Sequence, residues 1–181
     1  MRSIAIFVAI LILAACQKSV RKNDEISKVE VATSGCLRRC PVVGVQIDSS
    51  LKLVYNGGYK SKLQGYYDGK ISQDVWDTLN IKLKHINYRK IDTTEYLGID
   101  GENAEAIFYW GKQKRHIYRS IYENSDSISD ALIWIINCYK RAGLQKSKDS
   151  VKFETTYQNI KPPIMVKDPV KFPPSKKKKH Y

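Results

Sequence analysis

Residues 43–58 read VGVQIDSSLKLVYNGG, and this stretch decides the fold. Apolar side chains occupy every second position of residues 43–47, and the same alternation returns in residues 51–55. A period of two is typical of strands that bury one face. Asp48-Ser49-Ser50 supplies turn residues between the two runs, and Asn56-Gly57-Gly58 ends the second one. The stretch therefore predicts two neighbouring strands joined by a short turn.

A third strand and a helix are expected directly after this stretch. The strand covers residues 59–67 and ends at Asp68-Gly69, a pair that suits a tight turn. The helix covers residues 72–86, because Ser72 is a good N-cap and the apolar residues that follow it fall on one helical face.

The second half of the domain repeats the change from strands to helix. Residues 104–110 and 114–121 predict a hairpin around a short polar turn. A second helix is expected to begin near Ser127 or Ser129, with Gly143 as the residue just after its end.

Residues 151–157 predict one last strand. Strands, helix, hairpin and helix in this order predict an α+β fold over residues 35–158. We expect a single domain built as a two-layer sandwich, in which a mainly antiparallel sheet carries two helices on one face.

The two ends of the chain differ from this domain in composition. Residues 17–34 are polar without a clear period. Together with Cys16 they predict a lipidated N-terminus and flexible tether over residues 16–34. Five of the six prolines follow Ile160, together with a run of lysines. Residues 159–181 are therefore expected to form a basic, Pro/Lys-rich disordered tail.

The first residues have the pattern of a bacterial lipoprotein signal peptide, residues 1–15. The apolar run of residues 4–13 is too short to cross a membrane, which takes ~20 residues. It ends in Leu13-Ala14-Ala15-Cys16, which predicts cleavage before Cys16 and lipidation of its thiol. Position 17 is a glutamine and not the aspartate of an inner-membrane retention signal, so the sequence favours the outer membrane. It does not specify which face of that membrane carries the protein.

The formal net charge of +13 restricts the class of partner. A basic protein binds nucleic acid, anionic lipid head groups or anionic polymers. A lipoprotein outside the cytoplasm rarely meets nucleic acid, which leaves the membrane, an envelope protein or an anionic wall or lipid polymer as partners. The basic run Lys176, Lys177, Lys178 and Lys179 is either a solvated end or a weak contact to such a surface.

Three cysteines remain after the signal. Cys36 and Cys40 are four residues apart and precede Pro41, which in an oxidising compartment predicts a structural disulfide. The alternatives are a thiol-redox or metal site, in which neighbouring arginines would lower a thiol pKa. Cys138 is expected to be a buried free thiol on the last helix, or else the partner of Cys36 or Cys40.

No catalytic, cofactor or metal motif is apparent in the sequence. The three histidines have no metal-ligand or triad spacing, and the acidic pairs lie where they would cap helices. We therefore expect a non-enzymatic binding or structural module in the cell envelope, with a thiol-disulfide protein using Cys36 and Cys40 as the alternative.

Three parts of the sequence also resemble a known family. Cys36, Cys40 and Pro41, the run Leu53-Val54-Tyr55-Asn56-Gly57 and the helical residues 71–83 resemble uncharacterised bacterial envelope lipoproteins with an N-terminal Cys-x3-Cys-Pro strand motif. The chain departs from that motif at positions 37, 38 and 43. The family is a domain of unknown function, so the resemblance implies one α+β domain and an envelope location, and implies no activity.

Overall fold

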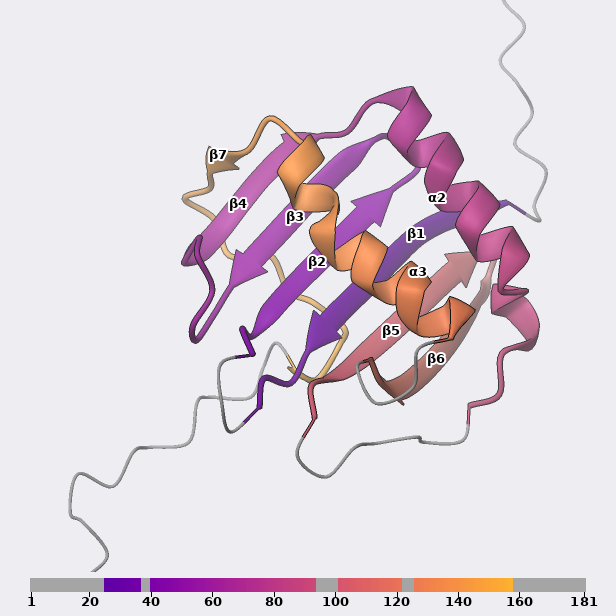
Figure 1. Cartoon of the computed structure of the whole chain (residues 1–181). Helices are drawn as coiled ribbons and strands as arrows, with labels where there is room; N and C mark the ends of the chain where they lie inside the picture. Colours follow the sequence, from indigo (N-terminus) through magenta and orange to yellow (C-terminus); the bar gives the residue numbers. More distant parts are fainter. Residues whose placement is uncertain (1–24, 37–39, 94–100, 122–125, 158–181) are drawn as a thin grey trace, which may run out of the picture.

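The protein folds into one twisted antiparallel sheet with two helices across one face (Figure 1). A computed structural model describes residues 25–36, 40–93, 101–121 and 126–157. The strand order is β6-β5-β1-β2-β3-β4-β7, and all neighbours are antiparallel. The α+β sandwich predicted from the sequence is confirmed. The strands are β1 (Ile26–Thr33), β2 (Val43–Asp48), β3 (Lys52–Gly57), β4 (Gly65–Lys70), β5 (Asn103–Trp110), β6 (Gln113–Ser120) and β7 (Gln145–Lys146).

Strand β1 corrects the expected tether, because the domain begins at residue 26 and not at residue 35. The strand lies in the middle of the sheet, paired with β2 on one side and β5 on the other. Val29 and Val31 are completely buried beneath the helices, whereas Lys28 and Glu30 lie on the opposite face. The strand was not predicted because the polar residues of 26–33 obscure the alternation expected of a strand. Glu30 is polar yet buried, because it contacts a distant segment that the sequence does not reveal.

The hairpin predicted from residues 43–58 is present as β2 and β3, with Val45 opposite Tyr55. The third strand is shifted: β4 begins at Gly65 and includes Asp68 and Gly69, which were expected to form a turn. Residues 58–61 turn instead. Gly69 is needed because a Cβ there would lie 2.6 Å from the Gly143 carbonyl oxygen.

Helices α2 (Gln73–His85) and α3 (Ser127–Ile136) supply the upper layer of the core. The hydroxyl oxygen of Ser72 caps α2 as predicted, and Asp126 caps α3 by accepting the Ser129 N–H. Leu79, Leu83, Leu132 and Ile135 are fully buried against the sheet. The 3₁₀ helices are η1 (Tyr88–Lys90) and η2 (Asn137–Arg141).

The end of the second helix also differs from the expectation. The α-helix stops at Ile136 and tightens into η2, whose last turn is closed by the Ala142 N–H donating to the Tyr139 carbonyl. Gly143 does not adopt the left-handed conformation of a helix-ending glycine. No helix within the described ranges has the length and hydropathy needed to cross a membrane.

The opposite face of the sheet is crossed by residues 153–157, which we name the C-terminal strap. A strand was expected there, but the residues form bends and no ladder. Phe153 is 2% exposed and anchors the strap. Glu30 Oε2 accepts the backbone N–H groups of Glu154 (2.8 Å) and Thr155 (3.3 Å). The strap is therefore held by a side chain of β1 rather than by strand pairing.

Candidate functional site

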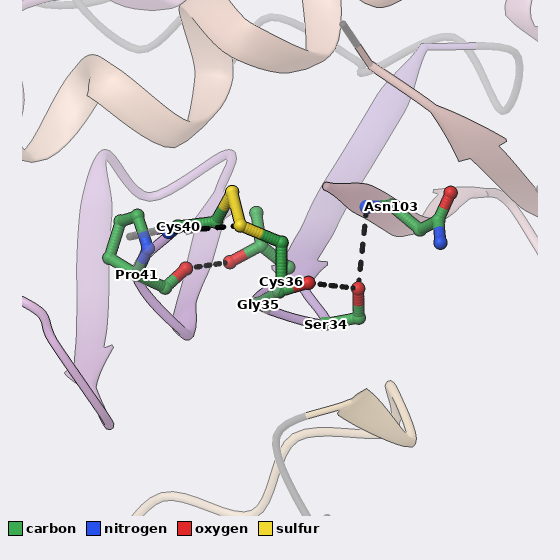
Figure 2. Close-up of a disulfide and its surroundings, with 7 residues drawn as sticks. Ser34, Gly35, Cys36, Cys40, Pro41 and Asn103 are labelled. Carbon is green, nitrogen blue, oxygen red and sulfur yellow. Dashed lines mark hydrogen bonds between the residues drawn. A yellow bond between two sulfur atoms is a disulfide. The ribbon is translucent and has the colours of Figure 1, made fainter. Parts of the chain in front are cut away.

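The disulfide between Cys36 and Cys40 lies between β1 and β2 (Figure 2). The pairing expected from the sequence is present, and the Cys40 N–H also donates to the Cys36 sulfur. Both cysteines are partly exposed. We name the described residues that flank this bond, 34–36 and 40–41, the disulfide turn. Gly35 has a φ of 73°, a left-handed conformation that glycine adopts at low cost.

This turn is tied to both neighbouring strands. The Thr33 hydroxyl donates to the Pro41 carbonyl (2.7 Å) and accepts the Val43 N–H (3.0 Å). On the other side, the Ser34 hydroxyl accepts the Asn103 N–H at the start of β5 (Figure 2). The disulfide turn therefore fixes where Pro41 lies relative to β1, β2 and β5.

Pro41 lines a cavity of about 310 Å³ between this end of the sheet and α3 with η2. Its volume falls at the lower end of the ~300–1,000 Å³ range of small-molecule sites. Half of the other lining residues are apolar or aromatic: Val43, Tyr55, Ile121, Ile133, Ile136 and Tyr139. The other half are polar or charged: Lys60, Ser61, Lys62, Glu102, Asn137 and Lys140.

Glu102 is the buried acid of this cavity. It immediately precedes β5, where its carbonyl accepts the Ile121 N–H, and its side chain joins the lining with only 5% of the residue exposed. Burial raises the pKa of Glu102 to about 7, while the nearby Thr33 hydroxyl acts in the opposite direction. The carboxyl group therefore exists in both protonation states near neutral pH, a property that often marks functional sites.

The rim of the cavity is basic. Lys60, Lys62 and Lys140 line it and are exposed. Tyr55 lies deeper, 1% exposed, with its ring 4.6 Å from that of Tyr139. Burial raises the pKa of Tyr55 to about 12, so this phenol stays protonated. The cavity thus combines apolar walls, one acid of variable charge and a cationic rim.

The loop that carries two of these lysines is held firmly. The Ser61 hydroxyl lies 2.9 Å from both the Gly58 and the Leu63 carbonyl oxygens, and it can donate to either. Gly57 packs so closely under this loop that a Cβ would lie 1.6 Å from the Leu63 carbonyl oxygen. The positions of the lysine backbones are therefore set by the fold.

A larger cleft of about 700 Å³ beside α2 is a weaker candidate. Some of its polar side chains are already engaged with each other or with the backbone: Gln73 donates to Asp77, and Asn80 donates to the Trp76 carbonyl. The two acids that line it among the described residues, Glu25 and Asp77, are exposed, whereas Glu102 is buried.

Two buried glutamates on the far face form a carboxylate clamp for the strap. Glu105 is completely buried; its Oε2 accepts the N–H groups of Thr156 (2.7 Å) and Tyr157 (2.9 Å) and the Thr156 hydroxyl, and its Oε1 lies 2.7 Å from His116 Nε2. Glu30 is arranged in the same way, with Lys28 on its other oxygen.

The pKa of Glu105 reflects these donors. Burial acts to raise it, but the backbone N–H groups of Thr156 and Tyr157, the Thr156 hydroxyl and His116 outweigh burial and lower the pKa. Glu105 is thus ionised near neutral pH, and both of its carboxylate oxygens are engaged. It is a structural feature of the strap, in contrast to the cavity acid.

The other residues singled out in the sequence fall in separate places. Cys138 is a free, buried thiol on η2, as one of the two expectations had it, and burial raises its pKa to about 12. Cys16 and Lys176, Lys177, Lys178 and Lys179 lie outside the described residues. Within the described ranges, no three His, Cys, Asp or Glu side chains gather as metal ligands.

Glu102, the most distinctive residue of the cavity, was not predicted from the sequence. In the sequence it stands between Gly101 and Asn103 and resembles an acid in a surface turn. The missed signal is its position directly before the apolar run of β5, where a side chain faces the interior as readily as the solvent.

Comparison with known proteins identifies the family of this domain. No curated protein matches the chain. A family model described as a domain of unknown function (DUF6438) matches residues 27–143, which begins inside β1 and ends after η2. The match includes the disulfide turn and all the residues that line the cavity. The resemblance to a domain of unknown function is confirmed, and the chain belongs to the DUF6438 family.

Proposed function

We propose that this chain is a bacterial envelope lipoprotein whose domain is a non-enzymatic binding module. The observation that carries the binding role is the cavity beside the disulfide, where apolar and aromatic side chains line one hollow together with the buried acid Glu102 and other polar groups. Small-molecule sites likewise join apolar surface to polar groups that orient the ligand.

The membrane anchor rests on the sequence around Cys16. Lipidation there would leave nine residues, 17–25, before β1 begins at Ile26. Nine extended residues span at most ~30 Å, so the domain would stay close to the membrane surface. Replacing Cys16 by serine is expected to move the protein from the membrane to the soluble fraction and to abolish incorporation of labelled palmitate. Unchanged membrane association would contradict the anchor.

The binding role is tested by blocking the cavity. Ile133 lines it and is only partly buried, so Ile133→Trp fills space without replacing a core residue. Ile81→Trp on α2 is the matched control, since Ile81 is 67% exposed and lies outside the cavity. Each protein is purified from envelopes, denatured, and its extract analysed by mass spectrometry.

The expected result is a small molecule that copurifies with the wild type and with Ile81→Trp and is lost from Ile133→Trp. Extracts that do not differ among the three proteins would contradict a ligand-binding role for the cavity.

A second candidate function uses the disulfide of Cys36 and Cys40. It is favoured by the partial exposure of both cysteines, which lie between the end of β1 and the start of β2. A thiol-disulfide protein needs a reducible bond, and structural disulfides have reduction potentials below about −300 mV. A potential below that value, measured by equilibration with dithiothreitol, would exclude this function.

The basic tail is the basis of a further proposal. We propose that residues 161–181, with Lys176–Lys179, attach weakly to an anionic lipid or wall polymer in the outer envelope. Such binding is screened by salt, with a Debye length of about 8 Å at physiological ionic strength. Binding to anionic vesicles or polymer that is unchanged after deletion of residues 161–181 would contradict this contact.

A further inference from the structure

The charges around the cavity point to the chemistry of its ligand. Lys60, Lys62 and Lys140 come from two separate parts of the chain, the β3–β4 loop and η2, and all three line the same cavity. Glu102, which is 5% exposed, lines the same cavity. Among the described residues that line the cavity, three lysines therefore stand beside one acid.

A cationic ligand is disfavoured by this arrangement. It would have to pass three ammonium groups and then rely on a carboxylate that burial makes costly to ionise. An anionic head group gains attraction from the same lysines at the rim, while its apolar body replaces water against Val43, Ile133 and Ile136.

We propose that the cavity binds a small amphiphilic anion, a medium-chain or aryl carboxylate, with its head group at the lysine rim and its apolar part beside a neutral Glu102. This inference rests on the proposed binding function and specifies its ligand. The volume of about 310 Å³ suits one short chain or ring and is too small for a two-chain lipid.

Glu102 couples this binding to pH. The apolar part of the ligand displaces water from the carboxyl group, which further favours its protonated form. The Thr33 hydroxyl on β1 lies near it. The charged and titratable groups that line the same cavity are Tyr55 on β3, Lys60 and Lys62 on the following loop, and Tyr139 and Lys140 on η2. Tyr55 stays protonated, so Glu102 is the group that takes up a proton as the anion binds near neutral pH.

The test is calorimetric titration of the full chain with three ten-carbon probes below their aggregation concentrations: decanoate, decanol and decylammonium. Decanoate is expected to bind most tightly of the three. Octanoate, titrated for comparison, is two carbons shorter and should bind about fifteenfold more weakly than decanoate, because each buried CH₂ is worth about a fourfold change in affinity. Titration in buffers of different ionisation enthalpy measures the protons exchanged. Uptake of protons is expected with decanoate at pH 7.

Binding of decanoate is expected to be about tenfold tighter at pH 6 than at pH 8, since the Glu102 pKa of about 7 lies between them. Glu102→Gln keeps the shape of the neutral acid, so its affinity should be nearly independent of pH. Lys60→Gln, Lys62→Gln and Lys140→Gln should each weaken decanoate about two- to fivefold. Lys112→Gln, an exposed lysine at the β5–β6 turn, should have no effect.

The outcomes separate the two proposals. Tighter binding of decylammonium than of decanoate, or release of protons by the wild type, would overturn the anionic ligand while the cavity remains a binding site. Binding of all probes that is unaffected by Ile133→Trp would overturn the cavity itself. The number of protons that the wild type takes up or releases on binding decides the direction of the pH dependence even where Glu102→Gln fails to fold.

Discussion

Replacing Glu105 by glutamine should loosen the C-terminal strap and destabilise the whole domain. The carboxylate accepts three hydrogen bonds on Oε2, at 2.7–2.9 Å, and contacts His116 through Oε1. Glutamine keeps one oxygen acceptor and loses the charge. Hydrogen bonds to charged groups contribute ~1.5–3 kcal/mol each, against ~1 kcal/mol for neutral ones.

The loss over these contacts is partly offset because a buried charge no longer has to be desolvated. We expect Glu105→Gln to lower the free energy of unfolding by about 2 kcal/mol, and Glu105→Ala by about 4 kcal/mol, since alanine leaves the strap N–H groups without an acceptor. Urea unfolding followed by tryptophan fluorescence measures both values.

Glu154→Gln is the matched control within the strap. Its carboxylate pairs with Lys114 and the Tyr109 hydroxyl, but Glu154 and Lys114 are 45% and 53% exposed. Exposed ion pairs contribute ~0–1 kcal/mol. A Glu105→Gln protein no less stable than Glu154→Gln, with unchanged hydrogen exchange at the Thr156 and Tyr157 amides, would refute the clamp.

The pH dependence has a definite sign. The pKa of Glu105 is lowered in the folded protein, so its contribution is complete above the ordinary carboxyl pKa of about 4.3 and is lost as the pH falls through the lower folded value. Wild type should therefore lose stability more steeply than Glu105→Gln as the solution is acidified below about pH 5. Parallel stability curves for the two proteins in that range would contradict this linkage.

Three further predictions concern the disulfide, the buried thiol and the helix cap. Replacing both Cys36 and Cys40 by serine should lower the free energy of unfolding, measured in urea, by about 2 kcal/mol, because the two cysteines are only four residues apart. A loss above about 4 kcal/mol would mean that the bond does more than restrict the unfolded chain. Cys138 should react with Ellman's reagent only after unfolding, since burial raises its pKa to about 12, and native-state labelling at the rate of a free cysteine would disprove its burial. Asp126→Ala should lower the free energy of unfolding by about 1–2 kcal/mol, because it removes the cap to the Ser129 N–H and the Arg119 contact. Asp126→Asn keeps the cap and should lower it less. Equal losses in the two variants would contradict the capping role.

Local patterns predicted the elements whose stability is local. Strands β2 and β3, the cap of α2 and the β5–β6 hairpin follow from alternation, capping and turn residues over short stretches. The disulfide of Cys36 and Cys40 was predictable for the same reason, since its two residues are four apart.

Contacts between distant segments explain what sequence reasoning missed. Glu30 makes β1 resemble a polar tether, yet its carboxylate binds a backbone N–H 124 residues away. The strap was expected to be a strand, but it forms no ladder because it is held by the carboxylates of Glu30 and Glu105 and by Phe153. Glu102 differs from a surface acid only through the elements that surround it, and these come together only in the folded chain.

The central claim is that the cavity beside the disulfide is the binding site of this domain. Titration of the ¹⁵N-labelled full chain with decanoate, followed by amide chemical shifts, tests it most directly. We predict that the shifts concentrate on residues lining the cavity, including Val43, Glu102 and Ile133, and that they are absent in Ile133→Trp. Shifts centred on the α2 cleft around Trp76 and Asn80, or no shifts at all, would contradict the account.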